Sequence, residues 1–274
     1  RAPMRKNSPV KDNEIRIRAD RFIVSSTTPK GVITDVNEYF CEVAGFQPDE
    51  LLGQAHNIVR HPDMPQAVFK LMWDTLQAGK PFMGIVKNRA KDGSYYWVDA
   101  YVTPLKEGNT IVGYESVRGA ATAARIARAQ EVYSRINKGL APVAPLYYWR
   151  EKLAVHSMLT VLLALIVPWV VGLSLGVASS HILAFVVAGV LVAASAYLAR
   201  QKHWAPVFEE ARATIDCPIT QFIYTGQVSD TGRILLVNQF NEVRTRALKH
   251  SVSNASSKIL RSARASESIA SDTA

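Results

Sequence analysis

The sequence predicts an α+β domain, an antiparallel sheet with helices on one face, followed by a two-helix transmembrane hairpin and a helical C-terminal segment. Three observations lead to this fold class. Residues 20–118 contain, in order, two short strand patterns, several short helical patterns and three longer strand patterns, separated by turn-forming glycines. Residues 153–199 contain no Asp, Glu, Lys or Arg. The last part of the chain repeats apolar residues at the spacing of a helical bundle.

Local signals set the expected boundaries in the first domain. Asn37 is a suitable N-cap for the helix after it, Gly45 is placed to end that helix, and Pro65 opens a longer one. Turns are expected at 91–93 and 106–109, where the strands of a three-stranded meander meet. The expected strands are Phe22–Ser25, Gly31–Asp35, Phe82–Arg89, Tyr95–Leu105 and Thr110–Val117, and the expected helical segments are Glu38–Val43, Pro48–Leu52 and the run from Pro65 to Gly79.

Composition narrows the classes of function. The chain has 274 residues and a formal net charge of +9. The basic excess lies mostly in 119–152 and 200–274, next to the charge-free window, which favours contact with anionic lipid over nucleic-acid binding. Two cysteines, Cys41 and Cys217, are too few for a disulfide framework.

The charge-free window is long enough for two membrane spans, about Leu153–Gly176 and Ile182–Ala199, joined by a short polar turn. Basic residues flank the window on both sides, at Arg150, Lys152, Arg200 and Lys202, whereas the turn carries no Lys or Arg. By the positive-inside rule both flanks are cytoplasmic, which predicts a multi-pass membrane protein. The alternative is a buried hairpin in a globular core, which the length and absence of charge disfavour.

The segment after the window is expected to form two helices. Pro206 is expected to open the first helix, and a connector, Cys217–Gly232, follows it. The second helix carries two sets of apolar residues in a 4-3-4 spacing, which are seam positions of a bundle: Leu236, Phe240, Val243 and Ala247, then Leu248, Val252, Ala255 and Ile259. The alternative is a single amphipathic helix lying on a membrane surface.

Motifs in the first domain carry a family resemblance. The run Arg60-His61-Pro62-Asp63-Met64-Pro65, the strand Gly84–Arg89 and the hairpin Lys91-Asp92-Gly93 before Tyr96-Trp97-Val98 resemble the flavin-binding PAS domain of bacterial aerotaxis transducers. The expected membrane hairpin is similar to that of the same receptors. The helix–connector–helix segment after it resembles a HAMP domain, with a loose match at Asp230-Thr231-Gly232. HAMP domains are dimeric bundles, so the resemblance implies a homodimer.

Several residues of the first domain are suited to an FAD site. Phe69, Trp73 and Phe82 offer apolar walls for the flavin ring, and Asn88 is an amide inside an apolar strand. Arg60 is suited to hold phosphate, and His61 can donate to a phosphate or ribose oxygen. Asp63 is expected to orient Arg60 or His61, or to cap the helix after Pro65. The resemblance implies that six positions affect flavin binding or signalling, namely Asn37, Arg60, His61, Asp63, Phe69 and Asn88.

Plainer interpretations of these residues stay open. Asn88 can lie on the solvent face of its strand, and Phe69 and Trp73 can be ordinary core residues. The family often carries Trp where this chain has Phe82, which puts the affinity or redox tuning of the flavin in doubt. A zinc site is disfavoured because His61 has no second ligand at a suitable spacing. No catalytic acid–base pair stands out, so we expect no enzymatic activity.

The resemblance implies a membrane-anchored redox or oxygen sensor of the bacterial inner membrane that relays the state of FAD through the HAMP segment to aerotaxis. The implied partners are a second copy, membrane lipid, and a chemotaxis kinase with its coupling protein, reached through a C-terminal domain absent from this chain; no nucleic acid is expected. The alternatives are a PAS sensor for haem or a small molecule that feeds a kinase or cyclase, and a non-sensory dimerisation module. The expected domains are 1–19, a cap; 20–118, the PAS domain; 119–152, a linker helix; 153–199, the hairpin; 200–262, the HAMP-like segment; and 263–274, the start of a truncated region.

Overall fold

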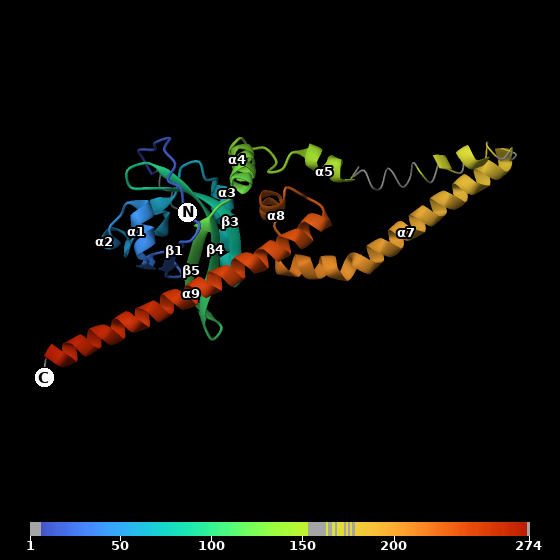
Figure 1. The fold of residues 1–274 in the computed structure, drawn as a ribbon. Coiled ribbons are helices and arrows are strands. Elements are labelled where there is room, and N and C mark those ends of the chain that lie inside the picture. Colours follow the sequence, from blue (N-terminus) through green and yellow to red (C-terminus); the bar gives the residue numbers. More distant parts are fainter. Residues whose placement is uncertain are drawn as a thin grey trace. The chain divides into compact units, whose positions relative to one another are not determined.

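The computed structural model describes residues 7–152, 163, 166, 167, 169–172, 174, 176 and 179–272. The chain divides into two compact units (Figure 1). The first unit comprises Arg1–Pro142 and Asn238–Ala274, and the second comprises Val143–Val237.

The first unit contains an antiparallel sheet of five strands in the order β2-β1-β5-β4-β3. Four helical segments lie between β2 and β3 in sequence and pack on one face of this sheet. The predicted α+β sheet with helices on one face is confirmed for this domain. The strands are β1 (Ile23–Thr27), β2 (Ile33–Val36), β3 (Phe82–Arg89), β4 (Tyr95–Glu107) and β5 (Thr110–Ala120), and the helical segments are α1 (Glu38–Ala44), α2 (Pro48–Leu51), η1 (His56–Val59) and α3 (Gln66–Gln77).

The helix-covered face, called the inner face below, is lined by two apolar clusters. One cluster joins α1 to the centre of the sheet and includes Phe40, Tyr96 and Val98. The other joins α3 to the sheet and includes Leu76 and Phe82. Because directly opposite residues of antiparallel strands share a face, the register places Gly84, Ala100 and Arg118 in one row of the inner face.

The opposite, outer face of the sheet is covered in part by α4 (Ala123–Asn137). The Tyr133 hydroxyl donates to the Ile85 carbonyl, and its ring stacks on Trp97 with centroids 6.5 Å apart. Asp99 of β4 pairs with Arg125 of α4 at 2.6 Å, and both side chains are largely shielded from solvent. Part of the expected linker helix within 119–152 is therefore present as α4, and it packs on the sheet.

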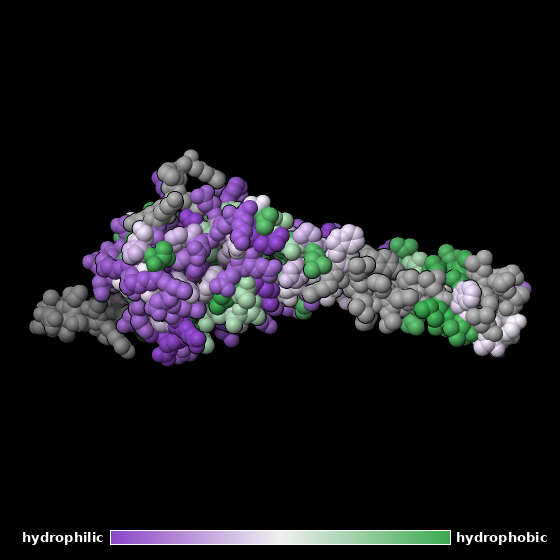
Figure 2. All heavy atoms as spheres, turned by 90° about the horizontal axis from the view of Figure 1, so that it is seen from above, coloured by the Kyte–Doolittle hydropathy of each residue, from purple (hydrophilic) through white to green (hydrophobic). Residues whose placement is uncertain are grey.

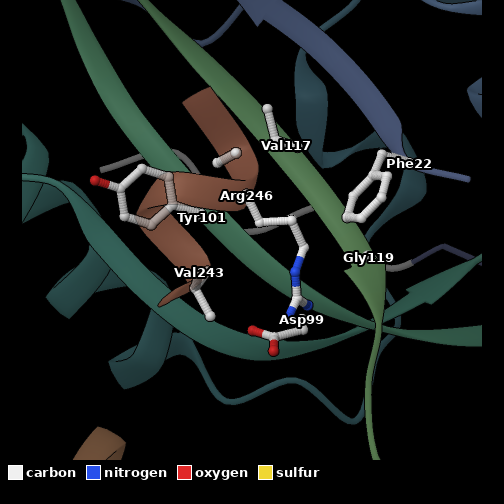
Figure 3. Close-up of a pocket in the computed structure, with 8 residues that line it drawn as sticks. Phe22, Asp99, Tyr101, Val117, Gly119, Val243 and Arg246 are labelled. Atoms are coloured by element: carbon white, nitrogen blue, oxygen red, sulfur yellow. The ribbon is translucent and has the colours of Figure 1, made fainter. Parts of the chain in front are cut away.

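The long helix α9 (Asp230–Asp272) also contacts the outer face. Phe240 packs edge-on against Tyr101 of β4, with ring centroids 5.8 Å apart, and His250 stacks on Phe22 at 3.8 Å. A small pocket lies at this contact, where Arg246 extends from α9 towards Asp99 (Figure 3). The first 4-3-4 set of apolar residues is buried, but Phe240, Val243 and Ala247 lie against the sheet or beside this pocket and not in the expected bundle seam. Leu248, Val252 and Ile259 of the second set are exposed.

The second unit contains α5 (Pro145–Lys152), α7 (Ser179–Thr214) and α8 (Pro218–Thr225). The prediction that Pro206 opens a helix is wrong, because Pro206 lies inside α7. The expected connector instead contains α8, which begins after Cys217 and ends at Gly226 with φ +69°. Gly226 adopts the left-handed conformation that glycine reaches without steric strain, which explains why the helix ends there.

The structure does not support the predicted transmembrane hairpin, and that part of the fold prediction is corrected. No helix among the described residues is both long enough and apolar enough for a bilayer crossing. The second expected span, Ile182–Ala199, is one part of α7, which continues without interruption into a charged stretch ending at Thr214. The first, Leu153–Gly176, lies largely outside the described residues. The multi-pass inner-membrane localisation that rested on this hairpin is corrected with it.

Apolar side chains are nevertheless exposed along α7. Figure 2 shows hydrophobic spheres there, whereas the surface seen over the first unit is mainly hydrophilic. Leu191, Val192 and Leu198 are each about two thirds exposed (64–67%). Exposed apolar side chains that gather in one region are typical of an interaction surface.

Candidate functional site

A buried polar cluster lies on the inner face of the sheet. Arg118 of β5 extends its Nη2 atom to the His56 Nε2 atom at 2.7 Å and to the Ser25 hydroxyl at 3.1 Å. The Ser25 hydroxyl lies 3.2 Å from the same histidine nitrogen. Because the arginine nitrogen must donate, His56 Nε2 accepts, and this hydrogen bond assigns the histidine proton to Nδ1.

In the described part of the chain, the cluster holds a buried positive charge without a negative partner. Among the described residues no carboxylate pairs with Arg118, and its Nη1 atom has no hydrogen-bond partner. Burial lowers the Arg118 pKa to about 10, still well above neutrality, so the guanidinium is charged. Burial and the neighbouring Arg118 together lower the His56 pKa to about 3, so this imidazole is neutral at pH 7. A buried unpaired cation is unfavourable unless something compensates it, which marks this cluster as a site for an acceptor group.

Two further polar side chains of the inner face lie beside this cluster. Asn88 is opposite Tyr96 in the β3–β4 register and only 4% exposed, so it faces inward and not towards solvent. The Tyr96 hydroxyl has no hydrogen-bond partner of good geometry in the described part of the chain. Burial raises the Tyr96 pKa, whereas Arg118 and Asn88 oppose that rise. All three groups, the amide, the phenol and the guanidinium, can donate a hydrogen bond, and the amide and the phenol can also accept one.

The sequence-predicted residue Arg60 is close to this group. Its backbone pairs with that of Asn88 in an isolated bridge, which attaches the segment after η1 to the edge of β3. The Arg60 guanidinium donates from Nη2 to the Met64 carbonyl at 2.6 Å and lies 5.2 Å from the centre of the Phe69 ring. Arg60, Phe69 and Asn88 are therefore brought together, as a shared site requires.

His61 and Asp63 lie on the other side of the same segment. The Asp63 backbone N–H donates to His61 Nδ1 at 3.2 Å, which assigns the ring proton to Nε2. The Asp63 carboxylate pairs with Lys87 at 2.7 Å and lies 3.4 Å from His61 Nδ1. Burial first, then Lys87, lowers the His61 pKa to about 4 against the opposing effect of Asp63. Asp63 thus contacts His61 as expected, and it does not cap α3, whose N-cap is Pro65.

Trp73 and Phe82 belong to the second apolar cluster. Trp73 packs edge-on against Tyr114 at 5.4 Å and rests on Gly31. The Phe82 ring lies over Gly84, since a Cβ added at that glycine would approach the ring to 2.8 Å. These two aromatic residues line the inner face on the α3 side, and Phe82 lies near the row that contains Arg118.

Asn37 lies apart from this group and stabilises the local fold at the start of α1. Its side-chain oxygen accepts from the Phe40 and Val24 backbone N–H groups at 3.1 and 3.0 Å, and its amide donates to the Phe22 carbonyl at 2.8 Å. With these three bonds it caps α1 and ties that helix to the start of β1. An effect of Asn37 on a ligand is therefore expected to be indirect.

The sequence interpretation did not single out His56, Tyr96 or Arg118 as site residues. One signal for Arg118 was present, because alternation along β5 places it on the same face as the buried Tyr114. The expected strand ended at Val117, one residue too early to include it. Among the described residues, no group of His, Cys, Asp and Glu is arranged to hold a metal ion.

Comparison with known proteins relates this domain to sensory proteins. The family model described as PAS fold matches residues 33–118. The aerotaxis receptor of Escherichia coli (strain K12) is 46% identical over 120 residues, which are 44% of this chain and 24% of that receptor. The nitrogen fixation regulatory protein of Klebsiella pneumoniae is 33% identical over 82 residues, 30% of this chain and 17% of that protein.

A solved structure is also similar. The dark structure of the blue-light photoreceptor Aureochrome1 LOV is 19% identical, with a TM-score of 0.35, over 37% of this chain and 76% of that one. The chain spans about a quarter of the length of the aerotaxis receptor that it matches. Residues 33–118 therefore form a PAS domain, and this domain is related to that of bacterial aerotaxis receptors.

Proposed function

We propose that the PAS domain binds FAD on the inner face of its sheet and senses redox state for chemotaxis signalling. The observation that carries the proposal is the buried Arg118 cation, whose Nη1 atom is without a partner among the described residues. The relationship to an aerotaxis receptor supports the choice of a flavin among possible ligands. The role is sensory and not catalytic.

The inner face suits a flat ligand with polar edges. Ala100 lies in the same row as Arg118, and its small side chain leaves the sheet surface low there, whereas the Phe82 ring covers Gly84 farther along the row. Arg118 and Tyr96 offer donors to carbonyl oxygens, and Asn88 can donate and accept on one edge. Phe69, Trp73 and Phe82 are placed to supply aromatic contacts around it. These features fit the flavin ring, and Arg60 and His61 fit the phosphates and ribose of FAD.

Bound FAD supplies a redox centre that gains electrons and protons at its ring. The chain's own residues make that change detectable, because a fixed cation in a buried site responds strongly to a change in the charge beside it. Arg118 donates hydrogen bonds to His56 and Ser25 and retains a further donor for the ligand position. Arg118 would be drawn more strongly to a ligand edge of greater negative charge, and it would then hold His56 and Ser25 less tightly.

The C-terminal helix is placed to receive this change. Val117 and Gly119 flank Arg118 on β5 and face outward, where they line the small pocket against α9 (Figure 3). A ligand biases such a contact only if it binds the two arrangements with different affinity. We propose that α9, as part of a HAMP-like segment in a homodimer, relays the state of the sheet to a chemotaxis kinase and its coupling protein through parts outside this chain.

Two tyrosines of β4 provide the test. Tyr96→Phe removes only the inward hydroxyl, whereas Tyr101→Phe, on the outer face, retains the ring that contacts Phe240. The full chain is purified with excess FAD, its absorbance spectrum is recorded, and the affinity of the apoprotein for FAD is titrated. We expect a flavin spectrum for the wild type, a loss of affinity of roughly two- to tenfold for Tyr96→Phe and none for Tyr101→Phe. A colourless wild-type protein, or equal affinities for both variants, contradicts the proposal.

A further inference from the structure

The N-terminal residues 7–15 form a strap along the β3–β4 hairpin. The Lys11 N–H donates to the Gly93 carbonyl at 2.7 Å. The Tyr95 N–H donates to the Asn13 carbonyl at 2.9 Å, and the Ile15 N–H donates to the Tyr95 carbonyl at 2.7 Å. The strap therefore pairs with the hairpin through its backbone, so its path is fixed.

Asn7 connects this strap to the segment that carries Arg60 and His61. Its side chain is buried, with 6% of the residue exposed, although it lies at the start of the described chain. Its Nδ2 atom lies 2.8 Å from the Asn57 carbonyl oxygen and 2.8 Å from the Arg60 carbonyl oxygen. An amide NH₂ carries two hydrogens, so both bonds form at once and bridge the two ends of the turn before His61.

A second arginine holds the strap beside Asn7. Arg89, the last residue of β3, is buried and donates from Nε to the Pro9 carbonyl at 2.7 Å and from Nη2 to the Ser8 carbonyl at 3.2 Å. Gly93 fits closely against the strap, since a Cβ there would lie 2.9 Å from the Pro9 oxygen. Asn7 is thus presented by a segment that is anchored immediately after it.

We propose that Asn7 is a positioning residue that fixes segment 57–64 and thereby slows the release of FAD from the domain. The inference rests on the proposed function for the identity of the ligand. The two carbonyls that Asn7 holds belong to residues 57 and 60, and the latter carries the guanidinium expected at the phosphates. Without the bridge, this turn retains its own Arg60 N–H to Asn57 carbonyl bond of 3.1 Å and its bridge to Asn88, so it loosens without unfolding the domain.

A matched control separates this role from general support of the fold. Asn13 is the same residue type in the same strap, but its amide donates to the Ser94 hydroxyl of the hairpin at 3.0 Å and does not touch segment 57–64. Asn7→Asp supplies a second comparison, because it retains the side-chain size and replaces the two donated hydrogens with a carboxylate that faces two carbonyl oxygens.

The experiment uses the full chain loaded with FAD and follows the appearance of free flavin after dilution. We expect Asn7→Ala and Asn7→Asp to release FAD roughly tenfold faster than the wild type, and Asn13→Ala to stay within about twofold. If Asn7→Ala releases FAD as slowly as Asn13→Ala, the proposal is overturned.

Amide hydrogen exchange in the apoprotein gives a readout that does not depend on flavin. We expect faster exchange in residues 57–64 for Asn7→Ala, with unchanged exchange in β4 and β5, and no such local increase for Asn13→Ala. Faster exchange throughout the sheet would show that Asn7 serves the whole fold and would overturn the positioning role. If the wild type binds no flavin, the proposed function fails, and local exchange alone decides whether Asn7 fixes the segment.

Discussion

Replacing Arg118 by Met is expected to make the apoprotein more stable while it impairs FAD binding. Burial lowers the Arg118 pKa from 12.5 to about 10, so the folded chain holds this proton less tightly than the unfolded chain does. A difference of about 2.5 pKa units corresponds to roughly 3 kcal/mol of destabilisation at neutral pH. Methionine fills most of the volume without charge, and the His56–Ser25 contact at 3.2 Å remains. We therefore expect the free energy of unfolding to rise by about 1–3 kcal/mol.

The affinity of the same variant for FAD is expected to fall by at least roughly tenfold, because hydrogen bonds from a charged donor contribute about 1.5–3 kcal/mol. Urea unfolding of the apoprotein and titration with FAD measure the two effects separately. Arg89→Met is the control, since Arg89 is a similarly buried arginine whose donors are used on the Pro9 and Ser8 carbonyls. The Arg89→Met variant should have a lower free energy of unfolding than the wild type. An Arg118→Met apoprotein that is less stable than the wild type and binds FAD normally would refute the reasoning.

Three further predictions concern pH and stability. Because the His56 pKa is about 3 in the folded state and near 6.5 when unfolded, the stability it contributes is complete above pH 6.5 and lost as the pH falls towards 3. Urea unfolding at pH 7 and pH 5 should show a loss of about 2 kcal/mol from this group, and His56→Gln should reduce the loss by that amount. Asn37→Ala should lower the free energy of unfolding by about 1–3 kcal/mol through loss of the α1 cap, with little change in FAD affinity at temperatures where the variant is folded. Asp99→Asn should leave Arg125 poorly compensated, lower stability by about 2 kcal/mol, and speed amide exchange in α4 more than in α1.

The strands and short helices of the PAS domain could be predicted because their signals are local. Asn37 caps α1 as its residue type suggests, and Gly45 ends that helix with φ +70°. The hairpin turn at 91–93 could be predicted in the same way, because Gly93 has φ +99°, a conformation that favours glycine. Each of these features depends on a few neighbouring residues and needs no knowledge of the tertiary structure.

The polar cluster of the inner face could not be predicted in the same way. Arg118, His56 and Ser25 are far apart in sequence, and only the pairing of β1 with β5 and the position of η1 bring them together. The burial of Asn7 under segment 57–64 likewise depends on contacts between residues 50 and 53 positions apart in the sequence. The rule that proline opens helices was misleading at Pro206, because proline inside a helix removes one backbone hydrogen bond but can kink the helix without ending it.

The geometry of β5 explains how a site on one face of the sheet can affect a helix on the other. Successive side chains of a strand point to opposite faces, so Arg118 faces the cluster while Val117 and Gly119 face α9. Gly119 leaves little room for movement, since a Cβ there would lie 2.8 Å from the Phe22 ring, which itself stacks on His250 of α9. A displacement of β5 that follows Arg118 towards or away from the proposed ligand should therefore shift the Phe22–His250 contact, because tightly packed atoms cannot absorb it. The site and α9 are therefore connected through adjacent residues of β5, and the connection needs no rearrangement of the rest of the domain.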